Sequence, residues 1–222
     1  MSYQGLARRY RPTTFDQIVG QDTVTRALSN AVKMGQVGQQ YLFVGPSGVG
    51  KTTTARVLAA ALGAEPPFDL EEIDCASHRG IDAIREICWL RMWLAPHGGK
   101  ARVFVLDECH QLSDAAFSAL LKPLEEPPRH TVMILVTTDI EKIPVTIRTR
   151  CQRFDFQTMA FDVVRAEAQR ILVAENIPFD PDRLRSIAIA ARGSMRTALQ
   201  LLDSEIVYGG GKVGDIAIRW IK

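Results

Sequence analysis

Before about residue 158, the chain alternates short apolar runs, rich in β-branched residues, with longer stretches of helical periodicity. Strands separated by helices of this length predict βαβ units and a parallel sheet. The runs 103–106 and 132–136 are apolar at every position, as expected of strands that are covered on both faces. Helical patterns between the strands include 52–62 and 81–94. The predicted strands are 41–44, 71–74, 103–106, 132–136 and 154–156.

After residue 158 the strand pattern stops and helical patterns take over. A helix is predicted over 161–176, with apolar residues on one side. Asp180 can cap a second helix, with Pro181 at its first position and Gly193 at its end. Ser194 can cap a third helix from Met195 to about residue 207, and a short final helix is expected after the glycines at 209–211. We therefore predict an α/β domain with a parallel five-stranded sheet over 1–158, followed by a small helical domain over 159–222.

The composition is that of a folded protein. The chain has 222 residues, 46% of them hydrophobic, which is enough for a buried core. A formal net charge of +2 is too small to indicate nucleic-acid binding by bulk charge, so any such contact needs a local basic patch. No run approaches the ~20 apolar residues of a membrane helix, and the N-terminus lacks a signal-peptide pattern. We expect a cytoplasmic protein with no membrane partner.

The cysteines and two tryptophans are expected to be core residues. No Cys-x-x-Cys pair occurs in the sequence, although structural zinc sites usually contain such pairs. Disulfides are also improbable in a cytosolic protein. Reduced, mostly buried thiols are therefore expected, and the tryptophans, one turn apart on the predicted helix 81–94, are expected to pack inward. These residues are Cys75, Cys88, Cys109, Cys151, Trp89 and Trp93.

Residues 45–52 fit the phosphate-loop pattern G-x-x-x-x-G-K-[ST] at every fixed position, after a predicted strand and before a predicted helix. The glycines permit backbone conformations that point N–H groups, together with the helix N-terminus, at phosphate oxygens. Lys51 is expected to reach the β- and γ-phosphates of ATP, and the Thr52 hydroxyl to bind Mg²⁺. The residues predicted to bind the phosphates are Gly45, Pro46, Ser47, Gly48, Val49, Gly50, Lys51, Thr52 and Thr53.

The predicted strand 103–106 ends in two carboxylates, Asp107 and Glu108. Ligands of open α/β sheets bind at the carboxyl ends of the strands. Asp107 is therefore predicted to bind Mg²⁺, and Glu108 to orient and deprotonate the water that attacks the γ-phosphate. Thr138 follows the strand 132–136 and could bond the same water, but threonines are common at strand ends, so its spacing alone does not decide its role.

Several further motifs, taken in their order and spacing, resemble the ATPase part of the bacterial DNA polymerase III clamp-loader gamma/tau family, within the AAA+ superfamily. The similarity runs from Met1 to about Val213. It implies an ATP-driven subunit that helps to open a sliding clamp and to load it on primed DNA. The motifs that carry it are Leu6-Ala7-Arg8-Arg9-Tyr10-Arg11-Pro12, Val19-Gly20-Gln21, Asp107-Glu108-Cys109-His110, Leu124-Glu125-Glu126-Pro127-Pro128, Thr149-Arg150-Cys151 and Gly193-Ser194-Met195-Arg196.

The resemblance also implies roles for single residues. The segment 11–20, with Arg11 and Val19, is expected to lie against the adenine, and Thr138 matches the sensor-1 position. Arg150 matches the finger that enters a neighbouring subunit's ATP site, and Arg196 the sensor-2 arginine of a lid domain. Guanidinium suits both positions because it is always charged and offers several donors. The expected catalytic residues are Lys51, Asp107, Glu108, Thr138, Arg150 and Arg196.

The chain departs from the family pattern in several places, including Pro123 in place of a typical threonine and Thr197 in place of a typical aspartate. Family members carry a four-cysteine zinc module after the phosphate-loop helix, whereas residues 63–72 fill that interval here without a cysteine. The expected cofactors are therefore ATP and Mg²⁺, without zinc. Arg148 stands where an apolar residue is usual, and Thr149 where serine is usual. The sequence also ends at Lys222, before the helical collar domain with which family members form a pentamer, so weak association between chains is expected.

The partners implied by the resemblance are other clamp-loader subunits in an assembly expected to be pentameric, a sliding clamp and primer-template DNA. Contacts to the DNA backbone are assigned to Arg79 and Arg85, with His78 and Lys122 as further candidates. Such contacts would be salt-sensitive and independent of sequence. A solvated basic face is an equally open interpretation of these residues.

Two other functions remain open at this point. One is a different AAA+ DNA motor, such as a branch-migration helicase or an initiator loader, against which the Leu-Glu-Glu-Pro-Pro and Thr-Arg-Cys segments argue. The other is a non-hydrolysing structural subunit of the loader, against which the intact set of Lys51, Asp107 and Glu108 argues.

Overall fold

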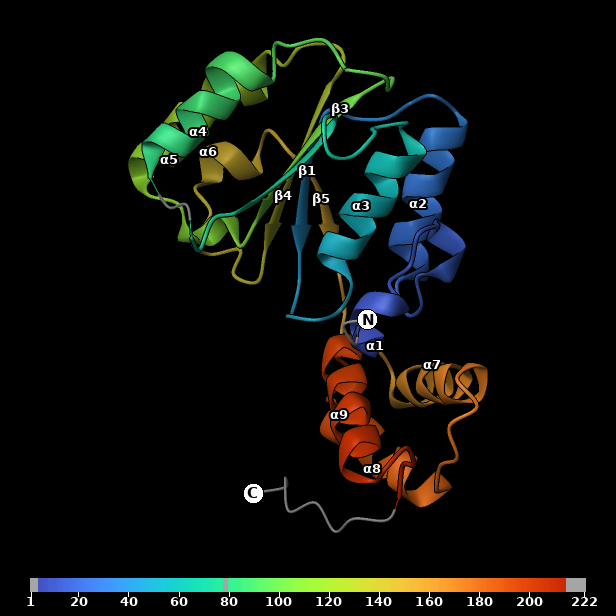
Figure 1. Ribbon diagram of the computed structural model, residues 1–222. Coiled ribbons are helices and arrows are strands. Elements are labelled where there is room, and N and C mark those ends of the chain that lie inside the picture. Colours follow the sequence, from blue (N-terminus) through green and yellow to red (C-terminus); the bar gives the residue numbers. More distant parts are fainter. Residues whose placement is uncertain (1–3, 78–79, 215–222) are drawn as a thin grey trace.

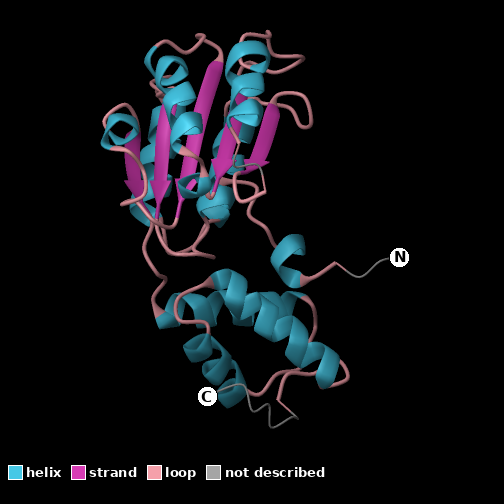
Figure 2. Cartoon of the chain, turned by 90° about the vertical axis from the view of Figure 1, so that its left-hand side faces the viewer, coloured by secondary structure: helices cyan, strands magenta, loops and turns pink. Residues whose placement is uncertain are grey.

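The computed structural model describes residues 4–77 and 80–214, except the side chains of residues 81, 83, 88 and 89. It has two parts, an α/β part in which helices flank a sheet and a smaller bundle of helices beside one end of that sheet (Figures 1 and 2). The smaller part approaches the end of the sheet at which the first strand, β1, leads into helix α3 (Figure 1).

The sheet has five strands, all paired in parallel, in the order β2-β3-β4-β1-β5. This confirms the predicted α/β fold with a parallel sheet. Because the strands are parallel, Val44, Asp107 and Thr137, the last residues of β1, β3 and β4, stand at one edge. The register pairs Val44 with Thr137 across β1 and β4. The strands are β1 (Gln40–Val44), β2 (Leu70–Asp74), β3 (Arg102–Asp107), β4 (Thr131–Thr137) and β5 (Gln152–Asp155).

Helices cover both faces of the sheet, and alternate strand residues point into two separate cores. Tyr41 and Phe43 of β1 pack with the residues of α2 and α3, whereas Leu42 and Val44 pack with those of α4, α5 and α6. None of the helices within the described ranges is both long and apolar enough to span a bilayer. The helices of this part are α2 (Asp22–Lys33), α3 (Lys51–Ala61), α4 (Ile81–Glu86), α5 (Asp114–Glu125) and α6 (Val145–Arg148).

The prediction of a continuous helix over 81–94 is wrong for the second half of that range. Regular α-helix ends at Glu86, and residues Ile87–Arg91 form a π-helical turn, with the amide of Met92 donating to the carbonyl of Ile87. A π turn adds one residue to the helical repeat and so rotates every later side chain. Met92 is fully buried as a result, whereas Trp93 is 56% exposed, which corrects its predicted place in the core. The side chain of Trp89 lies outside the described residues.

The smaller part contains α7 (Phe161–Ala174), α8 (Pro181–Ala190) and α9 (Met195–Tyr208), which confirms the predicted helical lid. The predicted caps are present, since the Asp180 side chain accepts from the amide of Asp182 and the Ser194 side chain from that of Thr197. Helix α8 ends at Ala190, before Gly193, and a short turn joins it to α9. The expected final helix falls largely on 215–222, outside the described residues.

Residues 6–10, near the start of the described chain, pack on the lid. Leu6, the first residue of α1 (Leu6–Arg9), is fully buried among lid residues, and its amide donates to the carboxylate of Asp203 on α9. Tyr10 donates from its hydroxyl to Glu175, just after α7. The domain boundary after residue 158 stays a prediction, but this segment ties the start of the first predicted domain to the second.

The loop that follows α3 is organised by a buried carboxylate, Asp69. Its oxygens accept from the amides of His97 at 2.7 Å and Gly99 at 2.9 Å, and its own amide donates to the carbonyl of Glu65. Burial raises the pKa of the Asp69 carboxyl, but donation by the amides of His97, Gly99 and Gly98 outweighs it, so the pKa lies below its usual value. One side chain thus joins two loops at the end of the sheet opposite to the phosphate loop.

Asp69→Asn is expected to lower the free energy of unfolding by about 1–3 kcal/mol, because an amide presents an N–H group to donors that need an acceptor. The depressed pKa of Asp69 in the folded state means that the carboxylate stabilises the fold above its unfolded pKa and loses this effect as pH falls through the folded pKa. Urea unfolding at several pH values measures this, with Asp162→Asn on the exposed side of α7 as the control. Equal stability of Asp69→Asn and wild type at pH 7 would contradict the assignment.

Candidate nucleotide-binding site

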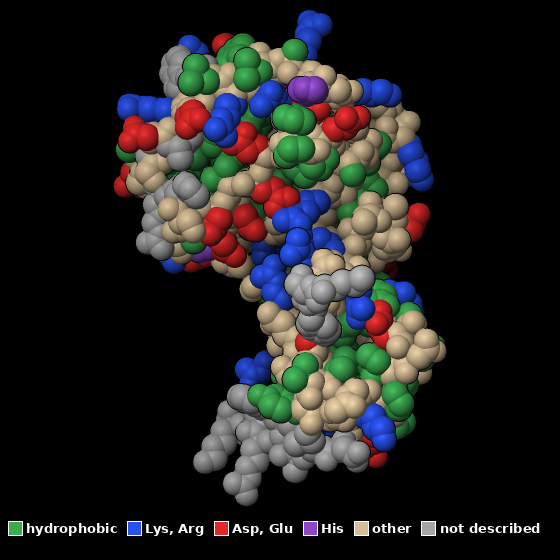
Figure 3. Space-filling view, in the orientation of Figure 1, with side chains coloured by type: hydrophobic (Ala, Val, Ile, Leu, Met, Phe, Trp, Pro, Cys, Tyr) green, Lys and Arg blue, Asp and Glu red, His purple; other side chains and the backbone are tan. Residues whose placement is uncertain are grey.

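A cavity of about 440 Å³ lies between the α/β part and the lid, within the size range of small-molecule sites. Lys and Arg side chains gather where the two parts meet (Figure 3). The phosphate-loop residues, the N-terminal segment and the lid each supply part of the wall. The lining residues are Ala7, Arg8, Tyr10, Arg11, Pro12, Gln17, Ile18, Val19, Ser47, Gly48, Val49, Gly50, Lys51, Thr52, Thr53, Asp107, Glu108, Met159, Glu167, Ile171, Met195, Arg196, Leu199 and Gln200.

The phosphate loop needs glycine at two positions for reasons visible in its surroundings. Gly45 has φ 154°, and a Cβ there would collide with the carbonyl oxygen of Phe156. Gly48 has φ 76°, and a Cβ there would collide with the hydroxyl of Ser194 at the start of α9. The loop is therefore pressed between the segment after β5 and the lid, and larger side chains at either position would move one of them.

Lys51 is 5% exposed, and its ammonium donates to the carbonyls of Gly45 and Pro46, both at 2.7 Å. Burial lowers the pKa of this ammonium, while the carboxylates of Glu108 and Asp107 act in the opposite direction. The ammonium thus lies inside the loop and beside the cavity, within the set of groups that would surround a triphosphate.

Thr52 and Asp107 lie in contact, with the threonine hydroxyl donating to the Asp107 carboxylate at 2.8 Å. They come from the start of α3 and the end of β3, and both line the cavity. A hydroxyl and a carboxylate are hard oxygen donors, which Mg²⁺ prefers, often as one or two protein ligands beside phosphate oxygens and water. The donor set therefore fits the magnesium ion expected from the sequence.

Glu108 has a backbone conformation that sequence patterns did not reveal. Its φ of 51° and ψ of 40° place it in the left-handed region, which is uncommon for residues other than glycine. Its carboxylate accepts from the Thr138 hydroxyl at 3.1 Å and lies 3.4 Å from the ring of His110. Two groups from the ends of neighbouring strands thus hold the carboxylate at the cavity. Thr138 itself does not line the cavity and reaches it only through Glu108.

The two arginines implied by the resemblance lie in different places. Arg196, at the start of α9, lines the cavity, and its amide donates to the carbonyl of Gly48 at 3.4 Å. Arg150, which follows α6, is not among the described residues that line the cavity; its guanidinium is bound to Glu125 at the end of α5 and to the carbonyl of Thr146.

The structure brings most of the predicted residues together. Arg11, Val19 and the loop residues from Ser47 to Thr53 line the cavity, whereas Gly45 and Pro46 contact it only through the Lys51 ammonium. Sequence patterns did not reveal that lid residues such as Met159 and Met195 line the wall, because their position depends on how the lid folds back. The capping residue Ser194, two positions before Arg196, marked the start of α9 in the sequence.

Gln21 is a further residue that the motifs left without a role. Its side chain is 4% exposed and donates to the carbonyls of Val49 at 3.2 Å and Gln157 at 2.8 Å, while it accepts from the amide of Gln157. It thus connects the phosphate loop with the segment that leads into the lid.

The candidate DNA contacts receive little support from the geometry. Arg79 and His78 lie outside the described residues, and Arg85 is exposed on α4. Lys122 is exposed on α5, where it takes part in an interaction within the chain. Their assignment to DNA stays a prediction.

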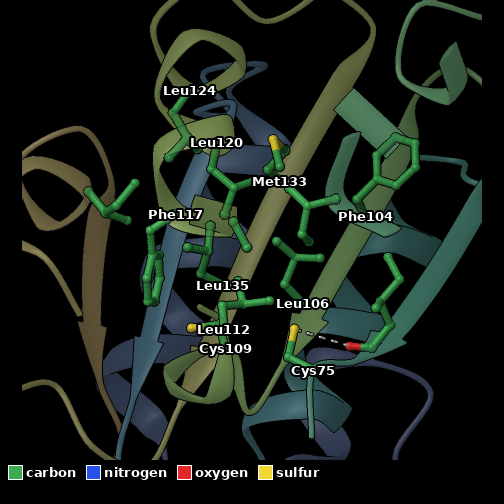
Figure 4. Packing of buried hydrophobic residues seen from close by; sticks show 14 of the residues in the cluster. Cys75, Phe104, Leu106, Cys109, Leu112, Phe117, Leu120, Leu124, Met133 and Leu135 are labelled. Carbon is green, nitrogen blue, oxygen red and sulfur yellow. Dashed lines mark hydrogen bonds between the residues drawn. The ribbon is translucent and has the colours of Figure 1, made fainter. Parts of the chain in front are cut away.

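The cysteines are placed as core thiols where their side chains are described. Cys75 and Cys109 are fully buried among apolar side chains (Figure 4), and Cys151 is half-buried. Burial raises the pKa of Cys75 and of Cys151 to about 12, and that of Cys109 well above its usual value. Over the described part of the chain, no group of three or more metal-ligating side chains could hold a metal ion.

Purified protein is expected to contain well under one zinc per chain, because thiols with raised pKa values resist the deprotonation that zinc binding requires. Elemental analysis after dialysis measures this, with the magnesium-dependent nucleotide binding of the same sample as a check on its integrity. Stoichiometric zinc that survives dialysis would contradict the prediction and direct attention to Cys75, Cys88 and His78.

Two protein families match consecutive parts of the chain. Residues 69–160 match the family described as "DNA polymerase III, delta subunit". Residues 163–211 match "DNA polymerase III clamp loader subunit, ATPase lid domain".

The chain is also similar to curated proteins. It is 40% identical to the DNA polymerase III subunit tau of Escherichia coli over 98% of this chain and 37% of that protein. It is 41% identical to the DNA polymerase III subunit tau of Bacillus subtilis over 95% of this chain and 41% of that protein. The chain thus spans well under half the length of these two relatives.

Among solved structures, the RuvB Holliday junction branch migration motor of Thermotoga maritima aligns with a TM-score of 0.73 at 20% identity, over 92% of this chain and 69% of that one. At this identity the similarity shows the fold alone, an AAA+ α/β sheet with a helical lid.

Proposed function

The chain belongs to the DNA polymerase III gamma/tau clamp-loader family, of which it spans the ATPase and lid part, and from this premise we propose that it is an ATP-driven motor subunit that helps to open a sliding clamp and load it on primed DNA. The observation that carries the proposal is the cavity in which the phosphate loop, Asp107, Glu108 and Arg196 meet. A structural subunit would have no need of this combination.

Within the cavity, the loop amides and Lys51 are proposed to bind the β- and γ-phosphates of ATP. The Lys51 ammonium would exchange the carbonyls of Gly45 and Pro46 for phosphate oxygens of higher charge. Thr52 and Asp107 would hold Mg²⁺, which neutralises charge on the β- and γ-phosphate oxygens.

Glu108 is proposed as the general base. Its carboxylate lies beside Asp107, at the cavity, and is oriented by the Thr138 hydroxyl. It would accept a proton from the attacking water while Thr138 fixes its direction. Arg196 would contact the γ-phosphate of the same chain from the lid, so that lid position and hydrolysis are coupled.

Arg150 is proposed to act on the ATP of a neighbouring subunit. It is not among the described residues that line the cavity of its own chain. The adenine would lie against the segment 11–20, which contributes Arg11 and Val19 to the wall. A hydrolysis site that is complete only at a subunit interface implies an oligomer. We propose that this oligomer is a pentamer, which the chain forms together with other clamp-loader subunits.

The proposed setting is the cytoplasm, with a sliding clamp and primer-template DNA as partners and with Arg79 and Arg85 as candidate DNA contacts. Mg²⁺ is proposed as the working metal, without zinc.

Two alternatives carry less support. The RuvB-like fold is shared by motors with different tasks, and its 20% identity contrasts with the 40% identity to the tau subunit. A branch-migration motor is therefore the weaker candidate. A non-hydrolysing structural subunit is disfavoured by the intact contact between Thr52 and Asp107 and by the position of Glu108.

ATP turnover under four conditions separates these functions: protein alone, with primed DNA, with sliding clamp, and with both. A clamp-loader motor is expected to respond most to DNA and clamp together. Stimulation by DNA alone, unchanged by the clamp, would indicate a helicase-type motor, and no stimulation under any condition would indicate a structural role.

A further inference from the structure

We propose that Glu125 is a positioning residue for Arg150, which it holds in an orientation from which the guanidinium can donate to a phosphate bound by a neighbouring subunit. This role rests on the proposed action of Arg150 in trans. Glu125 ends helix α5 and is not among the described residues that line the cavity of its own chain, so its candidate task in the phosphate chemistry is exerted through Arg150.

The guanidinium is attached at two edges. Its Nε donates to Oε1 of Glu125 at 2.9 Å, and its Nη2 donates to the same oxygen. Its Nη1 donates to the carbonyl oxygen of Thr146 at 2.6 Å. One attachment comes from α5 and the other from α6, so the plane of the guanidinium is fixed from two directions.

This arrangement leaves donors for a phosphate. A guanidinium carries five N–H donors, and these contacts use one each on Nε, Nη1 and Nη2. One N–H on Nη1 and one on Nη2 therefore remain. A phosphate can accept from both terminal nitrogens of one arginine.

The two groups that accept from the guanidinium, Glu125 and Thr146, are next to buried core residues. Leu124, directly before Glu125, and Ile147, directly after Thr146, are 2% and 0% exposed and belong to the same core cluster. Leu124 lies with Leu120 and Phe117 against the sheet (Figure 4). Buried apolar side chains therefore fix the backbone next to both acceptors of the guanidinium, Glu125 and the carbonyl of Thr146. The fixed acceptors in turn fix the position of the guanidinium.

The pair contributes little to the fold itself. The side chains of Arg150 and Glu125 are 32% and 50% exposed. Ion pairs at such exposure contribute little to the free energy of unfolding. Removing the carboxylate is therefore expected to leave the packing of α5 on α6 intact and to change mainly where Arg150 points.

The chain offers a matched control. Glu126 is the adjacent residue, is exposed, and its carboxylate pairs with no cation in the part of the chain that the structure describes. Glu126→Ala removes the same charge from the same surface without touching Arg150, so it separates positioning from general electrostatics.

The test measures ATP turnover per chain with Mg²⁺, at rising protein concentration and with added partner subunits. Glu125→Ala is expected to lower turnover by roughly 10- to 100-fold, since displacing a catalytic group by about 1 Å can cost about 100-fold, with the KM for ATP unchanged. Glu126→Ala is expected to match wild type. Glu125→Gln keeps an oxygen acceptor and is expected to recover part of the loss. In an Arg150→Ala background, Glu125→Ala is expected to have no further effect.

The outcomes distinguish this inference from the proposal on which it rests. If Arg150→Ala lowers turnover but Glu125→Ala equals Glu126→Ala, or raises turnover, Glu125 does not position the arginine and the inference is overturned. If Arg150→Ala itself has no effect, the action in trans fails and the inference falls with it. Thermal unfolding of each variant confirms that the folded state is compared.

Discussion

Arg150→Ala is expected to abolish the rise of ATP turnover with protein concentration or with partner subunits, while the affinity for ATP barely changes. An arginine supplied across an interface can contribute roughly 10³–10⁵ in rate, because its fixed charge balances the charge that develops on the transferred phosphoryl group. Since Arg150 does not line the cavity of its own chain, its loss leaves that binding site complete. Single-turnover hydrolysis and equilibrium nucleotide binding measure the two quantities separately.

Arg153→Ala is the control for this variant. Arg153 lies on β5, pairs with Asp155 at the surface and is half-exposed, so its removal deletes the same charge nearby. It is expected to behave as wild type. Normal hydrolysis by Arg150→Ala in the assembled complex, or wild-type turnover per chain that does not change with concentration or partners, would contradict the action in trans.

Glu108→Gln is expected to bind ATP normally, while its rate of hydrolysis falls by about 100-fold or more. The amide keeps the shape of the side chain and its contact with Thr138, but it cannot accept the proton of the attacking water. Filter binding of labelled ATP and a coupled turnover assay give the two readouts. Near-normal turnover would show that another group is the base.

Lys51→Ala gives the complementary result for the same site. It removes the buried ammonium that would contact the phosphates, so it is expected to weaken ATP binding itself. Tight binding with slow hydrolysis in Glu108→Gln, against weak binding in Lys51→Ala, would separate the chemical role from the binding role. Identical defects in the two variants would indicate that both act only through the fold.

The sheet and the heart of the site could be predicted from the sequence, because both follow from local patterns. Apolar runs with turn residues mark β1, β3 and β4, and parallel strands necessarily bring their carboxyl ends to one edge. Asp107 and the phosphate loop were therefore expected together, and Thr52 and Asp107 are in contact.

The features that the sequence did not predict depend on tertiary contacts or on changes of helical repeat. The π turn at Ile87–Arg91 adds a residue to the repeat without a marker such as proline, and Trp93 is exposed as a consequence. The left-handed conformation of Glu108 could not be predicted, because glutamate rarely adopts it.

Polar contacts between residues far apart in the chain could not be predicted from the sequence either. The carboxylate of Asp69 accepts from amides about thirty positions away along the chain, and Gln21 bonds the backbone of Gln157, 136 positions away. Neither residue stands in a pattern that names its partner. The attachment of Arg150 to Glu125 belongs to the same class, since both lay in recognised motifs but nothing in their spacing joined them.

Mixing two inactive variants tests most directly whether one hydrolysis site is built from two chains. Arg150→Ala chains retain Glu108, and Glu108→Gln chains retain Arg150, so a mixed interface can contain one complete site. Turnover of the mixture is expected to exceed the sum of the two variants measured alone, and to reach a maximum near equal amounts. A mixture that shows only the sum at every ratio, under conditions in which wild-type chains are active, would contradict a site shared between neighbouring subunits.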